Sequence, residues 1–446
     1  MTASTFSTPG SKPWSLLKQK DYILTNASIV DPLDGTLQHN MTVILRDGLI
    51  KHVLVPDEFV SWLSTFRPTP NTITVDLAGK YLCPGLIDCH VHVATPPGES
   101  GLAATMAVDP NTSLLRQPWL LRRMLNRGFT TVRDCGGASL ALQTAVAEGL
   151  HPGPRMFIAG KAISQTGGHG DGRSALTPES SGDCCGGHAA GIGRIADGVE
   201  ACLTAAREQL RQGADFIKIM ASGGVASPTD KLTSVQYTDE EVSAITRVAA
   251  AAGTYVTAHA YTPASIQHAI KNGVMGIEHG NLLDQETAEL MAAKGVFLTP
   301  TLTTYDAMAS REFAGFLPPG NAEKNLQVLD AGLRSIQIAD AAGVTLLYGS
   351  DLLGNLETRQ TREFVLRQKV QRPLKVLQAA TVNGARRLGM DGKLGRVKDG
   401  YVADLVVVGR DPLGDVGVFD EERGVEVVIK ERRVAMSRLQ GLVVEM

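Results

Sequence analysis

The sequence predicts an α/β protein: a (β/α)8 TIM barrel with a small β-sandwich domain formed by the N- and C-terminal segments. Apolar, strand-like runs alternate with Ala/Glu/Arg-rich helical stretches between residues 84 and 391, which is typical of parallel strands joined by helices. Further short strand-like runs flank this region on both sides, and neither set has enough strands to bury its own face. The 446 residues are sufficient for both units.

Eight strand-like runs predict the barrel. The first ends at His90, and the others cover residues 129–134, 155–159, 216–220, 255–259, 276–279, 296–300 and 344–351. Helical patterns lie between them, as at residues 238–250, where Thr238 is the expected N-cap. A doubly wound open sheet is the structural alternative. The barrel is favoured because no G-x-G-x-x-G follows the first strand.

The flanking strands define the expected domain boundaries. Residues 21–83 and 392–446 are predicted to form the β-sandwich, residues 84–391 the catalytic barrel, and residues 1–20 a short N-terminal leader. The flanking strands are expected at residues 22–24, 27–30, 42–45, 50–54, 403–408 and 425–430.

Charge and composition limit the classes of binding partner that the protein is expected to have. A net charge of −3 without a long Lys/Arg run argues against nucleic acid or an anionic membrane and favours a small-molecule or dipeptide substrate. No apolar run reaches the ~18 residues that span a bilayer, and the N-terminus lacks the pattern of a secretory signal. Six cysteines form no disulfide framework or paired zinc motif, and adjacent Cys184 and Cys185 are expected as free thiols. These features indicate a cytoplasmic protein.

Polar residues recur at the expected strand ends. His90 and His92 are two apart, so an extended strand points both imidazoles to one side. The other such residues are Lys218, His259, His279 and Asp351. Taken alone, each of these residues could have a purely structural role, as a paired lysine, a core histidine or a helix cap. Because the carboxyl ends of barrel strands meet at one mouth, the six together predict a metal site.

The motifs around these residues resemble those of a known family. Residues 164–171 (SQTGGHGD), 217–224 (IKIMASGG) and 258–261 (AHAY) resemble the metal-dependent amidohydrolase superfamily, in the imidazolonepropionase-like branch with Xaa-Pro dipeptidases and ochratoxin-hydrolysing amidases. The resemblance implies that CO2 carboxylates Lys218, which then bridges two divalent ions, usually Zn²⁺. It implies that His90, His92 and Asp351 hold one ion and His259 and His279 the other. Relatives are commonly assemblies, so a homo-oligomer is expected.

Physical chemistry supports this interpretation. Two ions ~3.5–4 Å apart share a hydroxide and lower the pKa of bound water toward ~7. Asp351 is then the expected general base and acid, taking the proton of that water and passing it to the leaving nitrogen. By resemblance, His169 contacts the substrate near its carbonyl and Tyr261 binds its α-carboxylate; loop or packing roles are the alternatives. The loop at residues 167–193 is expected to be a lid or rim, or else a flexible insertion.

These features predict a binuclear metal-dependent hydrolase that cleaves the amide bond of dipeptides or N-acyl amino acids by a metal-bridging hydroxide. Xaa-Pro dipeptides and ochratoxin A are candidate substrates, although the ochratoxin amidases have histidine in place of Tyr261. The alternatives are a cyclic amidase or a deaminase, and then a non-catalytic scaffold. Deaminases of this fold generally lack the bridging lysine, and scaffolds usually lack the ligands, whereas Lys218 and the other five residues are present.

Overall fold

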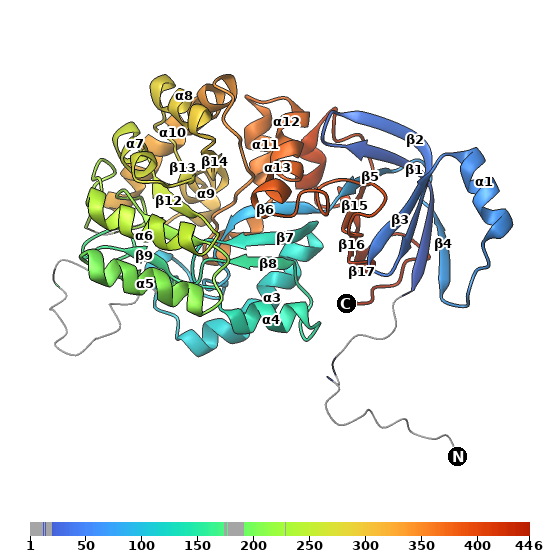
Figure 1. Cartoon of the computed structure of the whole chain (residues 1–446), viewed down its shortest axis with the longest axis horizontal. Coiled ribbons are helices and arrows are strands. Elements are labelled where there is room, and N and C mark those ends of the chain that lie inside the picture. Colours follow the sequence, from blue (N-terminus) through green and yellow to red (C-terminus); the bar gives the residue numbers. More distant parts are fainter. Residues whose placement is uncertain (1–11, 13, 15–19, 174–175, 177–190, 228) are drawn as a thin grey trace, which may run out of the picture.

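The computed structural model describes residues 12, 14, 20–173, 176, 191–227 and 229–446. Most of the predicted leader, most of the loop at residues 167–193, and Cys184 and Cys185 lie outside the described residues. Figure 1 shows a large sheet built from both ends of the chain beside a region in which strands and helices alternate. None of the described helices is long and apolar enough to cross a membrane.

The sheet at one end of the molecule contains strands from both the N-terminal and the C-terminal segment of the chain. Its strands are β1 (Asp21–Asp31), β2 (Thr36–Arg46), β3 (Leu49–Leu54), β4 (Thr72–Asp76), β5 (Tyr81–Pro84), β15 (Leu405–Val408), β16 (Val425–Lys430) and β17 (Arg433–Ser437). Seven follow the order β17-β16-β15-β5-β1-β2-β3, and β4 pairs with β1. The predicted pairing of the two segments is confirmed, because β5 and β15 are antiparallel neighbours. Hydrogen bonding connects all eight strands into one sheet.

Local details of this sheet differ from the predictions. Residues 22–24 and 27–30 belong to a single strand, β1, whose register shifts after Leu24 and after Ala27. The irregularity lies where Asn26 adopts a left-handed φ of +51°, a conformation that asparagine tolerates better than most residues. Helix α1 (Pro56–Thr65) was not predicted. Phe59, Trp62 and Leu63 follow a helical spacing, but the helix buries none of its residues.

Parallel strands form the alternating region. They are β6 (Leu86–Val91), β7 (Phe129–Asp134), β8 (Arg155–Ile158), β9 (Ala162–Ser164), β10 (Gly193–Ile195), β11 (Ile217–Met220), β12 (Val256–Ala260), β13 (Gly276–His279) and β14 (Phe297–Thr299). Their orders are β6-β7-β8 and β10-β9-β11-β12-β13-β14. Seven of the eight predicted runs contain a strand, and β9 and β10 were not predicted.

The eighth predicted strand, residues 344–351, is not a strand among the described elements. One parallel bridge pairs Leu346 with Leu298 of β14. On the other side, the Cys89 amide donates to the Tyr348 carbonyl at 2.7 Å, and the Asp351 amide donates to the His90 carbonyl at 2.8 Å. The segment therefore contacts both β14 and β6, although its hydrogen bonds are too sparse for a continuous ladder.

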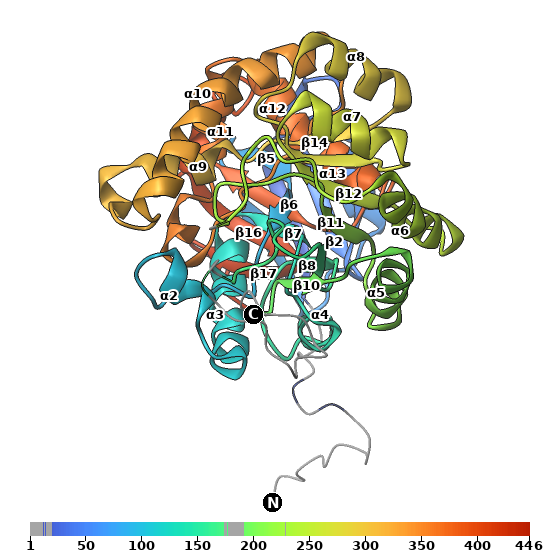
Figure 2. The same cartoon turned by 90° about the vertical axis from the view of Figure 1, so that its left-hand side faces the viewer.

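Helices surround these strands, as Figure 2 shows. They are α2 (Leu102–Met106), α3 (Pro110–Asn126), α4 (Leu140–Ala147), α5 (Val199–Arg211), α6 (Asp239–Ala251), α7 (Pro263–Lys271), α8 (Gln285–Lys294), α9 (Leu302–Ala309), α10 (Pro319–Ala341), α11 (Arg362–Gln368), α12 (Pro373–Ala379) and α13 (Val382–Arg387). The predicted N-cap of α6 is confirmed: Thr238 and Glu241 form a reciprocal capping box. Ile219, Ala258 and Ile277 share one buried cluster with side chains of the helices.

Candidate metal centre

Three of the predicted histidine ligands lie around the carboxylate of a fourth predicted ligand, Asp351. The Nε2 atoms of His90 and His92 lie 3.3 Å apart, and Asp351 Oδ1 lies 3.3 Å from the first and 3.2 Å from the second. His279 Nδ1 lies 3.8 Å from Asp351 Oδ2. His90 belongs to β6, His92 follows its end, and His279 is the last residue of β13. The carboxyl ends of separate parallel strands therefore bring these side chains together.

The backbone is unusual at two of these residues. His279 has a φ of +74° and Asp351 a φ of +53°. Left-handed conformations are uncommon for residues other than glycine and cost of order 1–3 kcal/mol each. Such strain persists only where the surrounding structure enforces it, and it is concentrated at functional sites. This backbone conformation thus supports a functional role for the end of β13 and the segment after residue 350.

His259 and Lys218 lie beside this group. The ring centroids of His259 and His279 are 4.5 Å apart. Burial, followed by the charges of neighbouring histidines and of Lys218, holds the pKa of His259 well below its usual range. Its imidazole is therefore neutral at neutral pH, the form that binds metal ions. Lys218 is only 1% exposed, and among the described residues no hydrogen bond or ion pair engages its ammonium.

Asp351 is ionised in this environment. Burial alone raises the pKa of a carboxyl group, but the His90 charge and hydrogen bonds from His90 and His92 outweigh it and hold the pKa of Asp351 well below its usual range. The carboxylate is 18% exposed and lines a cavity. It is thus an anion that both a cation and a substrate can reach.

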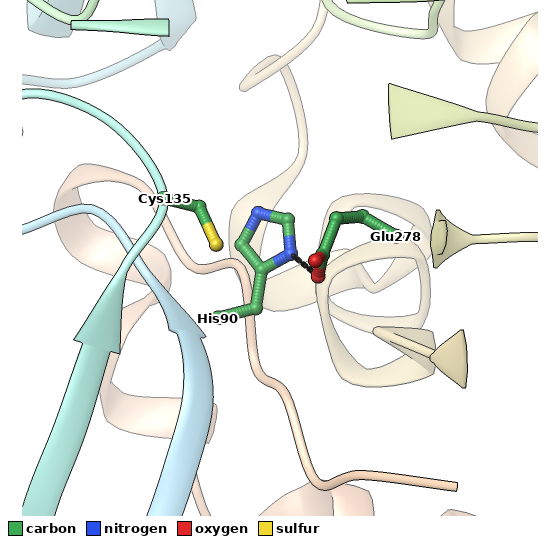
Figure 3. Close-up of side chains that lie close together, drawn as sticks. All are labelled: His90, Cys135 and Glu278. Carbon is green, nitrogen blue, oxygen red and sulfur yellow. Dashed lines mark hydrogen bonds and ion pairs between the residues drawn. The ribbon is translucent and has the colours of Figure 1, made fainter. Parts of the chain in front are cut away.

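A buried hydrogen-bond partner orients His90 through the ring nitrogen that faces away from Asp351. Figure 3 shows His90 Nδ1 hydrogen-bonded to Glu278 Oε2, at 2.8 Å. The other oxygen of Glu278 accepts from Arg133 at 2.6 Å and from Thr257 at 2.5 Å. Neither Glu278 nor Arg133 was predicted from the sequence; the available signal was a charged residue within a short strand-like run, in β13 (GIEH) and β7 (FTTVRD) respectively. Because Nδ1 of His90 is engaged, its Nε2 is the nitrogen directed at Asp351.

Within the part of the chain that the structure describes, two sets of side chains have metal-ligating atoms within 4.8 Å of one another. One comprises His90, His279 and Asp351, which were predicted as ligands. The other comprises His90, Cys135 and Glu278, drawn in Figure 3. In the second set both Glu278 oxygens already accept hydrogen bonds. The first set is therefore the better candidate for a metal centre.

A cavity of about 470 Å³ opens beside these residues. His92, His169 and Asp351 contribute polar atoms to its wall. Much of the remaining wall is apolar, formed by Leu102, Ala103, Met106, Ala107, Ile192, Met220, Ala226 and Leu353. No Lys or Arg occurs among its described lining residues. The cavity therefore suits a substrate that is largely apolar away from the reacting bond.

The two predicted substrate contacts are placed differently. His169 lines the cavity, and its ring stacks on that of His259 with centroids 4.0 Å apart. Tyr261 is 2% exposed and lies outside the described cavity lining. Its hydroxyl is hydrogen-bonded to that of Tyr305 at 2.7 Å, and Tyr305 also contacts His279 Nδ1 at 3.0 Å. Sequence reasoning missed Tyr305, which carries no motif signal.

Comparison with known proteins identifies the class. The model of the amidohydrolase family matches residues 81–441. Ochratoxinase from Aspergillus niger is 32% identical over 425 residues, covering 91% of this chain and 84% of the relative. These matches, with the site described above, define a hydrolase that acts on C–N bonds. The chain belongs to the amidohydrolase family.

Solved structures agree with this assignment. A prolidase complexed with N-methylphosphonate-L-proline is 41% identical, has a TM-score of 0.86, and is matched over 94% of this chain and 100% of its own. A Xaa-Pro dipeptidase with bound methionine in the active site is 28% identical, has a TM-score of 0.80, and is matched over 93% and 99%. The predicted branch of the superfamily is thereby confirmed.

Proposed function

We propose that this protein is a binuclear metal-dependent hydrolase that cleaves the amide bond of dipeptides or N-acyl amino acids. The observation that carries the proposal is the convergence of His90, His92, His279 and Asp351 beside buried Lys218. We further propose that residues 84–391 form a closed (β/α)8 barrel, that residues 21–83 and 392–446 form a β-sandwich domain, and that the chain is a cytoplasmic homo-oligomer.

The residues present fit a pair of zinc ions. Neutral imidazole nitrogens and a carboxylate oxygen are the donors that Zn²⁺ prefers. A buried ammonium without an anionic partner is costly, and carboxylation by CO2 would convert Lys218 into an anionic ligand. His90, His92 and Asp351 would then hold one ion, His259 and His279 the other, and carboxylated Lys218 would bridge them. Divalent ions supply Lewis acidity for water and for a carbonyl group.

The remaining chemistry belongs to side chains. Asp351 is ionised and lines the cavity, so it would take a proton from water and pass it to the leaving nitrogen. His169 lines the same cavity and would contact the substrate near the scissile carbonyl. The geometry gives weaker support to Tyr261 as the residue that binds the α-carboxylate of the substrate, because the Tyr261 hydroxyl is already hydrogen-bonded to that of Tyr305.

A substrate screen tests the proposal. The zinc-loaded protein is incubated with Xaa-Pro and Xaa-Phe dipeptides, N-acyl amino acids and ochratoxin A, and the release of free amino acid is measured. We expect hydrolysis of at least one class, and loss of it in Asp351→Asn. Cyclic amides and aminated heterocycles are tested in parallel. Ring opening or ammonia release without cleavage of any linear amide would favour the cyclic amidase or the deaminase and contradict the proposal.

A further inference from the structure

Asp88 is a buried carboxylate close to the site that the proposed chemistry does not use. It lies on β6, two residues before His90, and is fully buried. Its Oδ1 accepts from the backbone N–H groups of His90 and Ser350, both at 3.1 Å. Its Oδ2 accepts from the Ser350 hydroxyl at 2.6 Å and from Gln360 Nε2 at 3.0 Å. Asp88 thus connects β6 to Ser350, the residue that precedes Asp351.

The turn that carries Asp351 depends on contacts with β6. Asp351 has a φ of +53°, which in a residue other than glycine persists only where neighbouring groups enforce it. The amides of Ser350 and Asp351 donate to the His90 carbonyl at 3.2 and 2.8 Å, and Asp88 adds two contacts to Ser350. Since no described strand covers residues 344–351, these contacts replace the ladder that would otherwise hold the turn.

Gln360, the second side-chain donor to Asp88, is itself held in one orientation. It directly follows the short helix η2 (Gly354–Arg359) and is 2% exposed. Its Oε1 accepts from Arg127 of α3 at 3.4 Å, and its carbonyl accepts from the Tyr348 hydroxyl at 2.6 Å. The side-chain amide cannot turn over without losing the contact with Arg127, so Nε2 faces Asp88. Both oxygens of Asp88 therefore face donors, an arrangement that a carboxylate satisfies and an amide does not.

We propose that Asp88 is a positioning residue that, through Ser350, holds the carboxylate of Asp351 among the predicted histidine ligands. Asp88 is not among the described residues that line the cavity, so it would affect the reaction only through Asp351. The part of this inference that concerns zinc and turnover rests on the proposed hydrolase function. The position of Asp351 does not, because it follows from contacts within the protein.

Crystal structures of two variants test the position of Asp351 without substrate. Asp88→Asn keeps the shape of the side chain, but either orientation of the new amide places its NH₂ group against two donors. We expect Asp351 to leave the left-handed region and its Oδ1, which lies 3.2 Å from His92 Nε2, to lose contact with that ring. Ser350→Ala removes only one contact and should displace the turn less. If Asp351 keeps its φ and its contact with His92 in both variants, the proposal is wrong.

Zinc affinity provides a second readout. In a competition titration with a chelator, Asp88→Asn is expected to weaken zinc binding about 10- to 100-fold. The matched control is Asp215→Asn. Asp215 also accepts from a backbone N–H, that of Ile158 at 2.8 Å, and from a glutamine, Gln143 Nε2 at 3.0 Å. It precedes β11 and so lies at the opposite ends of the strands. We expect the control to keep wild-type zinc affinity, and equal losses in the two variants would contradict a specific role for Asp88.

A double-mutant cycle determines whether Asp88 acts through Asp351. In an Asp351→Asn background, Asp88→Asn is expected to weaken zinc binding less than about threefold. Additive losses would mean that Asp88 acts independently of Asp351 and would refute the positioning role.

Turnover separates positioning from substrate binding. On the best substrate of the screen, Asp88→Asn is expected to lower kcat about 10- to 100-fold, since it displaces the residue expected to transfer the proton. KM should stay within about threefold, because Asp88 does not line the described cavity. A rise in KM with unchanged kcat would contradict the proposal. If no substrate is cleaved or no zinc binds, the proposed function fails, while the crystal structures still decide this inference.

Discussion

Replacing Glu278 with glutamine tests how strongly the buried partner of His90 supports the centre. Glu278 and Arg133 are both fully buried, and Arg133 donates to Glu278 at 2.6 Å. Two unit charges about 4 Å apart at an effective dielectric constant of about 20 attract by about 4 kcal/mol. Glutamine keeps the shape of the side chain but leaves the Arg133 charge unpaired. It also places an amide donor against either His90 or the donors Arg133 and Thr257.

We therefore expect Glu278→Gln to lower the free energy of unfolding by about 3–5 kcal/mol, the cost of removing one partner of a buried ion pair. Loss of the orientation of His90 should also weaken zinc binding about 10- to 100-fold. Urea unfolding of the metal-free protein measures the first effect, and a competition titration with a zinc chelator measures the second.

The matched control is Glu357→Gln. Glu357, itself 6% exposed, pairs with two arginines, Arg123 and Arg127, which are 39% and 17% exposed, and neither arginine contacts a predicted ligand. We expect it to cost about 1 kcal/mol and to leave zinc affinity unchanged. The reasoning would be refuted if Glu278→Gln lowered the free energy of unfolding no more than Glu357→Gln does and bound zinc with wild-type affinity.

Three further predictions address other residues. Lys218→Ala should reduce bound zinc from two ions per chain, measured by elemental analysis, and remove the ¹³C signal of a lysine carbamate in protein equilibrated with labelled CO2; an unchanged zinc content would contradict carboxylation. Asp351→Asn should keep the wild-type circular dichroism spectrum while kcat falls about 10²- to 10⁴-fold; unchanged turnover would remove its role in proton transfer. Burial, partly offset by Arg367, raises the pKa of Glu363 to about 8. Since the folded-state pKa exceeds the unfolded value, this carboxyl group stabilises the fold fully below about pH 4.5 and loses that contribution as the pH rises to about 8. Glu363→Gln should therefore flatten the dependence of unfolding free energy on pH by up to about 1.4 kcal/mol per pH unit across this range; parallel curves for the two proteins would show that Glu363 does not titrate there.

Local patterns were sufficient to predict most strands but not their irregularities. The runs that contain β7, β11 and β13 were predicted correctly, because alternation and apolar character are properties of consecutive residues. Residues 344–351 were predicted to form a strand on the same grounds, and this prediction is wrong because their backbone does not form a continuous strand. There a Cβ atom on Gly349 would lie 2.9 Å from His90 Cβ, and Asp351 turns into a left-handed conformation. Both features depend on contact with β6, which is distant in the sequence.

The sequence by itself determined the candidate ligands, since His90, His92, Lys218, His259, His279 and Asp351 were selected by residue type and by position along predicted strands. It also determined the family, through motifs that the comparisons confirm. Only the tertiary structure decided how these side chains are held. His90 is oriented by Glu278, 188 residues away, and Ser350, next to Asp351, is hydrogen-bonded to Asp88, 262 residues away. Neither pair has a local pattern, because a hydrogen bond requires only that two atoms meet, and folding brings them together from unrelated parts of the chain.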